Sequence, residues 1–286
     1  MRIPLNKLLL WRWIADLRAE KHELGVRVGL LQAALQKVRL PPILITTMPK
    51  SGTYYISKLF TQGLFIDSQI VSHQYFPYDV IRQPELRVFA HGNMVSQDHF
   101  GASKINLVHI AKHVDRMVVH VRDPRQAMLS YVHYLATPRF RQAEDETRLF
   151  IYPPMPEDFY QFDLEARIDW AIDNWLPLLV EWTEEWVGAA DAHDRPRIKF
   201  TRYEDLVTDR DRFVRDVLEF FRIPVERYFP PSIEPDDDIH FRKGEVAEWM
   251  TAFTPKQAAA ASAKIPLGLA TQFGWSVEGV PSASSR

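Results

Sequence analysis

Short apolar runs alternate with segments of helical spacing along most of this chain. Four mostly apolar runs predict buried strands, at residues 43–47, 86–90, 117–121 and 198–201. Between them, apolar residues recur at three- and four-residue steps, for example over 56–64 and 126–135, which predicts helices. Apolar strands separated by helices are typical of a parallel sheet covered on both faces. We therefore expect an α/β fold with three layers, α/β/α, around a central parallel sheet.

Residues 1–40 also have helical spacing, in two pieces divided near Gly25. One interpretation is a pair of helices packed on the domain. The other is an arm that contacts a membrane surface or a second copy of the chain, because residues 8–11 are apolar between Lys7 and Arg12. Charges in this region are mixed rather than gathered on one basic face, which favours the first interpretation.

Residues 138–165 are rich in charged, proline and aromatic residues and separate two helical stretches. They predict a surface loop, which is either a lid over a reactive site or a plain connection. Beyond it, four residues at helical spacing predict a stripe that faces the core: Trp175, Leu179, Trp182 and Trp186. Small polar residues predict a flexible tail over 277–286. Because no long linker or internal repeat divides the chain, we expect a single domain over 1–286.

Composition narrows the functional classes. The 286 residues are 46% hydrophobic and 12% aromatic, which is typical of a globular protein with a buried core. The formal net charge of -2 provides no global attraction to nucleic acid or to anionic membranes. The lack of cysteine excludes disulfides and a cysteine nucleophile, and no apolar run is long enough for a signal peptide or a transmembrane helix. We expect a soluble, cytoplasmic protein that acts on a small molecule.

The turn after the first strand carries the clearest chemistry. The apolar run leads into Pro49, Lys50, Ser51, Gly52 and Thr53, and helical spacing begins directly afterwards. Such a strand-to-helix turn directs main-chain N–H groups at a ligand, Gly52 allows close approach, and Lys50 adds positive charge. This cradle suits a phosphate or a sulfate. A Walker-type loop does not fit, because it places the lysine after its second glycine.

The order Pro-Lys-Ser-Gly-Thr resembles the 5′-phosphosulfate loop of sulfotransferases that use 3′-phosphoadenosine 5′-phosphosulfate (PAPS). A second segment resembles the 3′-phosphate motif of the same family. In it, Arg122 closes the third predicted strand, and Ser130 follows eight residues later with Tyr-x-His behind it. A guanidinium supplies paired donors that suit phosphate oxygens, and the hydroxyl adds one more.

Two further segments extend the resemblance, so that four motifs occur in the family's order over residues 43–254. Arg242, Lys243 and Gly244 resemble the C-terminal segment whose charges close over the 3′-phosphate. Tyr203 stands at the position that contacts adenine, and Tyr55 at that of an aromatic residue stacked on the base, directly after Tyr54 of the loop. A chance match to one motif is common, whereas four matches in the family's order are strong evidence for the resemblance.

The resemblance implies an enzyme that moves a sulfuryl group from PAPS to a hydroxyl, or less favourably an amine, and releases 3′-phosphoadenosine 5′-phosphate (PAP). Lys50 would stabilise the leaving phosphate, and no metal is required. As the general base we choose His91, which follows the predicted strand 86–90. Other choices are His73, His99 or a carboxylate.

Departures from the family pattern leave several points open. Phe89-Ala90-His91 stands where many members have Lys-Thr-His, so a second positive group must come from elsewhere, such as Lys104. The family's C-terminal dimer motif retains Thr254 but not its lysine, valine and glutamate, so the oligomeric state is open. Alternatives are a nucleotide kinase or hydrolase and a nucleotide-binding protein without catalysis. The acceptor stays undefined, because variable loops build acceptor pockets.

Overall fold

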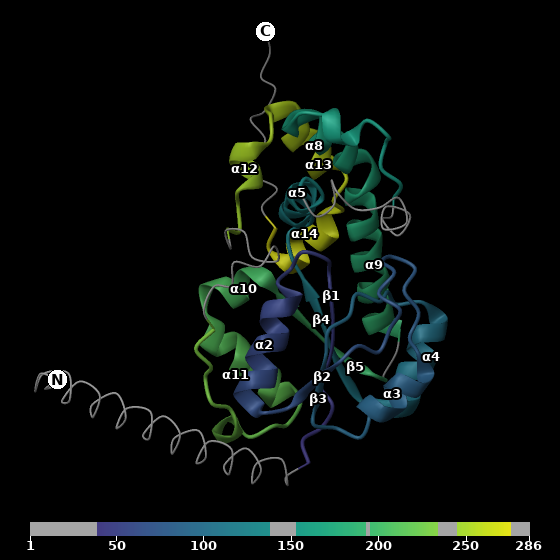
Figure 1. The fold of residues 1–286 in the computed structure, drawn as a ribbon, viewed down its shortest axis with the longest axis vertical. Coiled ribbons are helices and arrows are strands. Elements are labelled where there is room, and N and C mark those ends of the chain that lie inside the picture. The colour runs from purple at the N-terminus through teal and green to yellow at the C-terminus, as the bar shows by residue number, and fades with distance from the viewer. Residues whose placement is uncertain (1–38, 138–152, 193–194, 234–244, 276–286) are drawn as a thin grey trace, which may run out of the picture. The chain divides into compact units, whose positions relative to one another are not determined.

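The fold is described by a computed structural model that places residues 39–137, 153–192, 195–233 and 245–275 (Figure 1). The chain divides into two compact units, Met1–Leu40 and Pro41–Arg286, and all elements below belong to the second. The predicted helical arm, up to residue 38, and the predicted tail over 277–286 lie outside the described residues. In the part that is described, no helix is both long and apolar enough to cross a membrane.

Parallel strands form the centre of the fold. β1 (Leu44–Thr47), β4 (Arg116–Val121) and β5 (Arg197–Arg202) pair in the order β1-β4-β5, and β2 (Asp67–Gln69) pairs with β3 (Met94–Ser96). Parallel bridges from Ile43 to Val95 and from Thr46 to Asp98 place β3 beside β1. The strands therefore follow the order β2-β3-β1-β4-β5. This parallel arrangement confirms the predicted α/β fold and the three predicted strands at 43–47, 117–121 and 198–201.

Helices flank the sheet and gather beyond the carboxyl ends of its strands (Figure 1). α2, α10 and α11 lie on one side of the sheet in this view, and α3, α4 and α9 on the other. Their bounds are α2 Thr53–Leu64, α3 Gln83–Phe89, α4 Lys104–His113, α9 Leu176–Ala192, α10 Tyr203–Thr208 and α11 Arg210–Phe220. The remaining α-helices are α5 Pro124–Leu135, α8 Leu164–Asn174, α12 Trp249–Ala252, α13 Pro255–Ala263 and α14 Leu267–Phe273.

The predicted strand over 86–90 is wrong, because these residues belong to helix α3 and its end. Pro84 occupies the first turn, where its fixed φ suits a helix. Leu86 and Phe89, three residues apart, are both buried, whereas Val88 between them is half exposed. A strand would have put Leu86 and Val88 on one face. The nearby strand is instead β3, which follows a turn at Gly92 and Asn93 with positive φ.

The predicted tryptophan stripe is confirmed as core. Trp175 ends α8, the other three residues lie on α9, and all four are buried. The indole N–H groups of Trp182 and Trp186 donate to the Phe100 carbonyl at 3.1 and 3.4 Å. The Thr46 hydroxyl donates to the same oxygen at 2.9 Å. The segment that follows β3 is therefore attached both to α9 and to β1.

The predicted loop over 138–165 is only partly described. Residues 138–152 lie outside the described residues, and the rest contains a short 3-10 helix, η1 (Phe159–Gln161). Phe159 is fully buried and packs edge-on against Trp170 of α8, with ring centroids 5.1 Å apart. The second part of this segment is thus packed on the helices, and the lid stays a prediction. The second 3-10 helix, η2 (Val225–Arg227), follows α11.

Candidate functional site

The Pro49–Thr53 turn joins the carboxyl end of β1 to the first residue of α2, as the sequence predicted. Lys50 has a φ of 65° and Gly52 a φ of 84°, so two residues of the turn adopt the left-handed conformation. Gly52 is the N-cap of α2 and provides no side-chain cap, and the first turn of α2 contains no acidic residue. The first N–H groups of the helix and its positive dipole end are therefore suited to bind an anion.

His120 supports this turn through a hydrogen bond to its main chain. It lies next to the carboxyl end of β4 and is fully buried. Its Nε2 donates to the Ser51 carbonyl at 3.1 Å, and its Nδ1 accepts from the Thr201 hydroxyl at 2.8 Å. Burial, helped by the charge of Arg122, lowers the pKa of His120 to about 3, so the ring is neutral. Sequence reasoning missed this residue, although a histidine inside an apolar strand is a usable signal.

Arg122 connects the predicted motifs to one another. It follows β4, is nearly buried, and donates to the Lys50 carbonyl at 2.5 Å and to the Glu245 carbonyl at 2.7 Å. Its guanidinium stacks on the Tyr203 ring at 3.9 Å. A Cβ on Gly52 would come within 3.2 Å of that same ring. The loop, the strand-end arginine and the tyrosine of α10 are thus one contact cluster.

The other predicted donor-binding residues lie on the elements around this cluster. Ser130 is half-buried on α5, about two helical turns after Arg122. The exposed Tyr54 has the Lys58 ammonium 4.6 Å above its ring, and the half-buried Tyr55 hydrogen-bonds Arg210. Arg242, Lys243 and Gly244 lie outside the described residues, which resume at Glu245. The roles predicted for Ser130, Tyr54 and Tyr55 in donor binding therefore stay predictions.

A buried ion pair attaches the C-terminal helices to the start of α5. Arg125 forms a bidentate pair with Asp123, at 3.0 and 2.7 Å, and donates to the Ser262 hydroxyl of α13 at 2.9 Å. Its guanidinium also lies 3.8 Å above the Trp249 ring of α12. Thr254, retained from the family's dimer motif, caps α13 through a capping box with Gln257. Sequence reasoning did not single out Arg125.

His91 does not have the position that motivated its choice. It follows helix α3 rather than a strand, is exposed, and precedes β3. Because β3 runs parallel to β1, His91 lies at the amino end of the sheet, whereas Lys50 follows the carboxyl end of β1. Neighbouring parallel strands put their carboxyl ends at the same edge. The interpretation of His91 as a residue at the strand end is therefore wrong.

His99 is the histidine at the carboxyl end of β3. Its Nδ1 lies 2.8 Å from the Thr47 carbonyl and 3.1 Å from the Thr47 hydroxyl. A carbonyl only accepts, so Nδ1 carries the hydrogen and Nε2 is the acceptor of the neutral ring. The pKa of His99 is lowered, chiefly by burial and also by the charge of Lys50. The Thr47 hydroxyl in turn lies 2.6 Å from that of Thr53.

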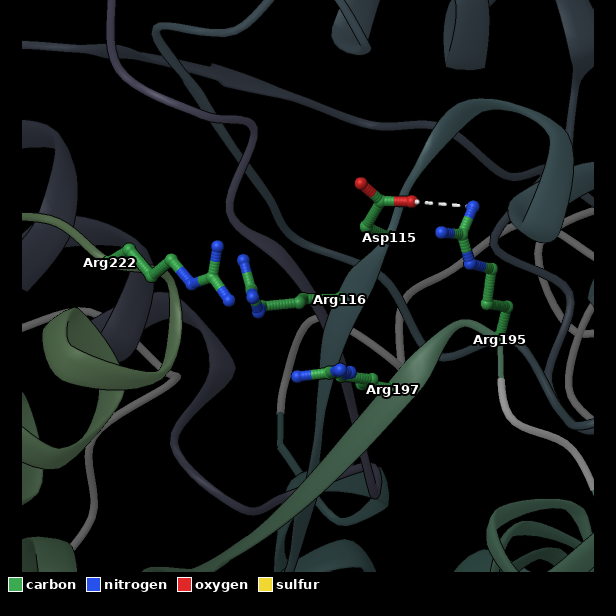
Figure 2. A pocket seen from close by; sticks show the side chains of 5 residues that line it. All are labelled: Asp115, Arg116, Arg195, Arg197 and Arg222. Carbon is green, nitrogen blue, oxygen red and sulfur yellow. Dashed lines mark ion pairs between the residues drawn. The ribbon is translucent and has the colours of Figure 1, made fainter.

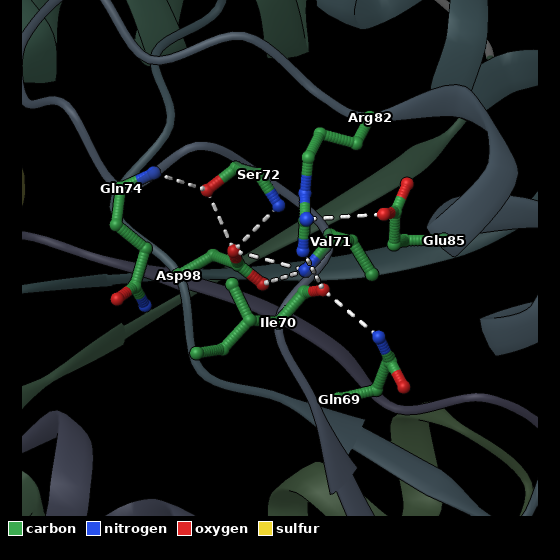
Figure 3. A network of polar contacts seen from close by, with 8 residues as sticks. All are labelled: Gln69, Ile70, Val71, Ser72, Gln74, Arg82, Glu85 and Asp98. Carbon is green, nitrogen blue, oxygen red and sulfur yellow. Dashed lines mark hydrogen bonds and ion pairs between the residues drawn. The ribbon is translucent and has the colours of Figure 1, made fainter.

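The neighbouring Asp98 binds the main chain at Val71 and Ser72 (Figure 3). Its buried carboxylate accepts from the N–H groups of Val71 and Ser72 at 3.0–3.2 Å, and its main-chain carbonyl accepts from Thr47 at 3.0 Å. The single Ser72 hydroxyl faces two carboxylates, Asp98 at 2.7 Å and the buried Asp79 at 2.5 Å. Burial raises the pKa of Asp98 to about 6, and the charge of Asp79 adds to the effect.

The sequence is similar to those of known proteins. The family described as "Sulfotransferase domain" matches residues 40–239. Sulfotransferase 6B1 of Danio rerio is 24% identical over 161 residues, which cover 50% of this chain and 48% of that protein. Sulfotransferase 6B1 of Homo sapiens is 21% identical over 252 residues, or 77% and 74% of the two chains. The chain thus spans about half the length of the first relative and about three quarters of the second.

The fold is also similar to that of a solved structure, mouse sulfotransferase SULT7A1 complexed with PAP. The TM-score is 0.52 at 15% sequence identity, over 79% of this chain and 83% of that chain. At this identity the similarity concerns the fold.

Proposed function

Because the chain belongs to the sulfotransferase domain family, we propose that it transfers a sulfuryl group from PAPS to a hydroxyl group of a small-molecule acceptor. An amine is the less favoured acceptor. The observation that carries the proposal is the contact cluster in which Arg122 binds the Lys50 carbonyl and stacks on Tyr203. This meeting of segments that are far apart in sequence supports the proposal of a single donor site.

The proposed donor site has two parts, one for each phosphate-bearing end of the nucleotide. The main-chain N–H groups at Ser51, Gly52 and Thr53, with the Lys50 ammonium, bind the 5′-phosphosulfate. Arg122 and Ser130 bind the 3′-phosphate together with Arg242, Lys243 and Gly244. A guanidinium carries five N–H groups, so Arg122 is able to hold main-chain carbonyls and a phosphate. Tyr203 and Tyr55 contact the adenine, and Tyr54 flanks the loop.

Transfer is an in-line displacement at sulfur. The bond between sulfur and the bridging phosphate oxygen breaks as the acceptor oxygen forms a new S–O bond, and PAP leaves. Lys50 stabilises the negative charge that develops on the leaving oxygen, without a metal. His99 replaces His91 as the proposed base, because its Nε2 is the acceptor of a neutral ring at the loop's edge of the sheet.

The assignment of the base has a matched test. We expect His99→Ala to lower kcat by roughly 10²–10⁴-fold and to leave PAP affinity within about twofold, because general-base catalysis contributes about this much. The exposed His91→Ala is the control and is expected to keep the wild-type rate. Mass detection of the sulfated product, over a panel of phenols, steroids, sugars and other alcohols, supplies the assay. An unchanged rate in His99→Ala would exclude this base, and magnesium-dependent nucleotide turnover would favour a kinase or hydrolase.

A further inference from the structure

A second cluster of positive charge lies at the opposite end of the sheet from the Lys50 turn. A pocket of about 390 Å³ is lined by Asp115, Arg116, Arg195, Arg197 and Arg222 (Figure 2). Arg116 and Arg197 are the first residues of β4 and β5, so they lie at the amino ends of these strands. The donor-binding cluster lies at the carboxyl ends. The two sets of arginines therefore belong to separate edges of one parallel sheet.

Three of these guanidiniums face one another. Arg116 and Arg197 are partners in the register of β4 and β5, so their side chains share one face. Arg222 follows α11 in the left-handed conformation, with a φ of 58°, and its guanidinium points toward that of Arg116 (Figure 2). Like charges directly opposite each other are destabilising. Partial burial lowers the pKa of Arg116, and the charges of Arg222 and Arg197 lower it further.

The lining residues do not neutralise this charge. Asp115 is the one carboxylate among them, and its side chain forms an exposed ion pair with Arg195 at 3.5 Å. Figure 2 shows this pair on the far side of β4 from Arg222. Four arginines and one aspartate thus meet in a chain whose net charge is only -2. The excess is local, and a bound anion with several oxygens would offset it.

We propose that Arg116, Arg197 and Arg222 form a second anion site, which binds ligands that carry phosphate groups. Planar guanidiniums match phosphate oxygens through paired N–H donors, and three of them suit a ligand with two or more negative charges. The pocket volume is near the lower end for small-molecule sites, which suits a diphosphate or a phosphorylated headgroup. A soluble phosphate ester and a phospholipid headgroup share this chemistry. The site is separate from the proposed donor site and does not depend on it.

Calorimetric titration with inorganic pyrophosphate, in the presence of excess PAP, tests the site. The full chain is compared with the variant Arg116→Gln/Arg222→Gln, which removes two charges and keeps polar side chains. The control Arg87→Gln/Arg212→Gln removes two charges from exposed positions that do not line the pocket. We expect the pocket variant to lose at least tenfold in pyrophosphate affinity and the control to stay within about twofold.

Two outcomes overturn the proposal: wild-type protein that binds neither pyrophosphate nor anionic vesicles, or a pocket variant that binds like wild type. Co-sedimentation with vesicles containing phosphatidylinositol phosphate, against phosphatidylcholine alone, distinguishes the sources. Binding of vesicles lost in the pocket variant identifies a headgroup, and binding of pyrophosphate alone identifies a soluble ester. Thermal unfolding supplies a folding control, because the pocket variant is expected to be at least as stable as wild type. If PAP itself fails to bind, the loss of pyrophosphate binding in the pocket variant still tests this site, because neither substituted residue belongs to the Lys50 turn.

Discussion

Replacing Asp98 by asparagine is expected to change how the stability of the protein depends on pH. The pKa of the Asp98 carboxyl is raised from 3.8 to about 6, chiefly by burial. The folded protein therefore holds this proton more tightly than the unfolded chain does. Stability is unaffected below the unfolded pKa, falls as pH rises between 3.8 and about 6, and then levels off. At 1.36 kcal/mol for each pKa unit, the loss is up to about 3 kcal/mol.

The amide side chain in Asp98→Asn does not titrate, so the difference in unfolding free energy between the two proteins isolates this carboxyl. Urea unfolding, followed by tryptophan fluorescence between pH 4 and pH 7, measures it. We expect the stability of wild type relative to Asp98→Asn to fall by up to about 3 kcal/mol over this range. Glu185 and Glu204, whose pKa values burial also raises, titrate in both proteins and cancel.

The hydroxyl of Ser72 provides a companion variant. Its hydrogen bond lowers the pKa of Asp98, so Ser72→Ala is expected to extend the loss of stability above pH 6. A difference between wild type and Asp98→Asn that stays flat with pH would refute the reasoning. It would mean that burial does not raise the pKa of Asp98 in the folded protein.

Three other predictions concern the site. Because the pKa of His99 is lowered and the base must be neutral, kcat/KM is expected to be flat above pH 6.5 and to fall only at lower pH; a fall that begins above pH 7 contradicts this. Arg125→Met leaves Asp123 buried without its partner, so the free energy of unfolding measured in urea is expected to fall by about 3–5 kcal/mol. Much of this loss should be recovered in Arg125→Met/Asp123→Asn. A loss under about 1 kcal/mol argues against a stabilising ion pair. Gly52→Ala places a side chain at a φ of 84° and crowds Tyr203. We expect it to lose about 1–2 kcal/mol of stability and at least tenfold in PAP affinity. Gly188→Ala, on an open helix face, serves as the control.

β1 and β4 were predictable because they are buried on both faces. Their apolar runs at 43–47 and 117–121 need no tertiary information to be recognised. β5 is only partly buried, and its run at 198–201 is shorter and includes Lys199. β2 and β3 each have three residues, and β2 consists of Asp67, Ser68 and Gln69, so neither makes such a run. The apolar residues at 86–90 were assigned to a strand in place of β3, and that error moved the proposed base from His99 to His91.

The motifs predicted which segments meet, but not the side chains that hold them. Lys50, Arg122 and Tyr203 were found because their spacing matches a family pattern. His120, Arg125 and Asp98 act as single residues whose partners are distant in sequence, and no local period marks them. Buried polar groups of this kind are recognised by the contacts that satisfy them. Such contacts become visible only when the chain is folded.

Equilibrium binding of PAP to the purified full chain and to Arg122→Ala tests the central claim most directly. The account predicts one PAP bound per chain, and at least a tenfold loss of affinity in the variant, because Arg122 joins the Lys50 turn to Tyr203. His91→Ala, at the other edge of the sheet, is the control and should bind PAP like wild type. Failure of the wild-type chain to bind PAP, or unchanged binding by Arg122→Ala, would contradict the account.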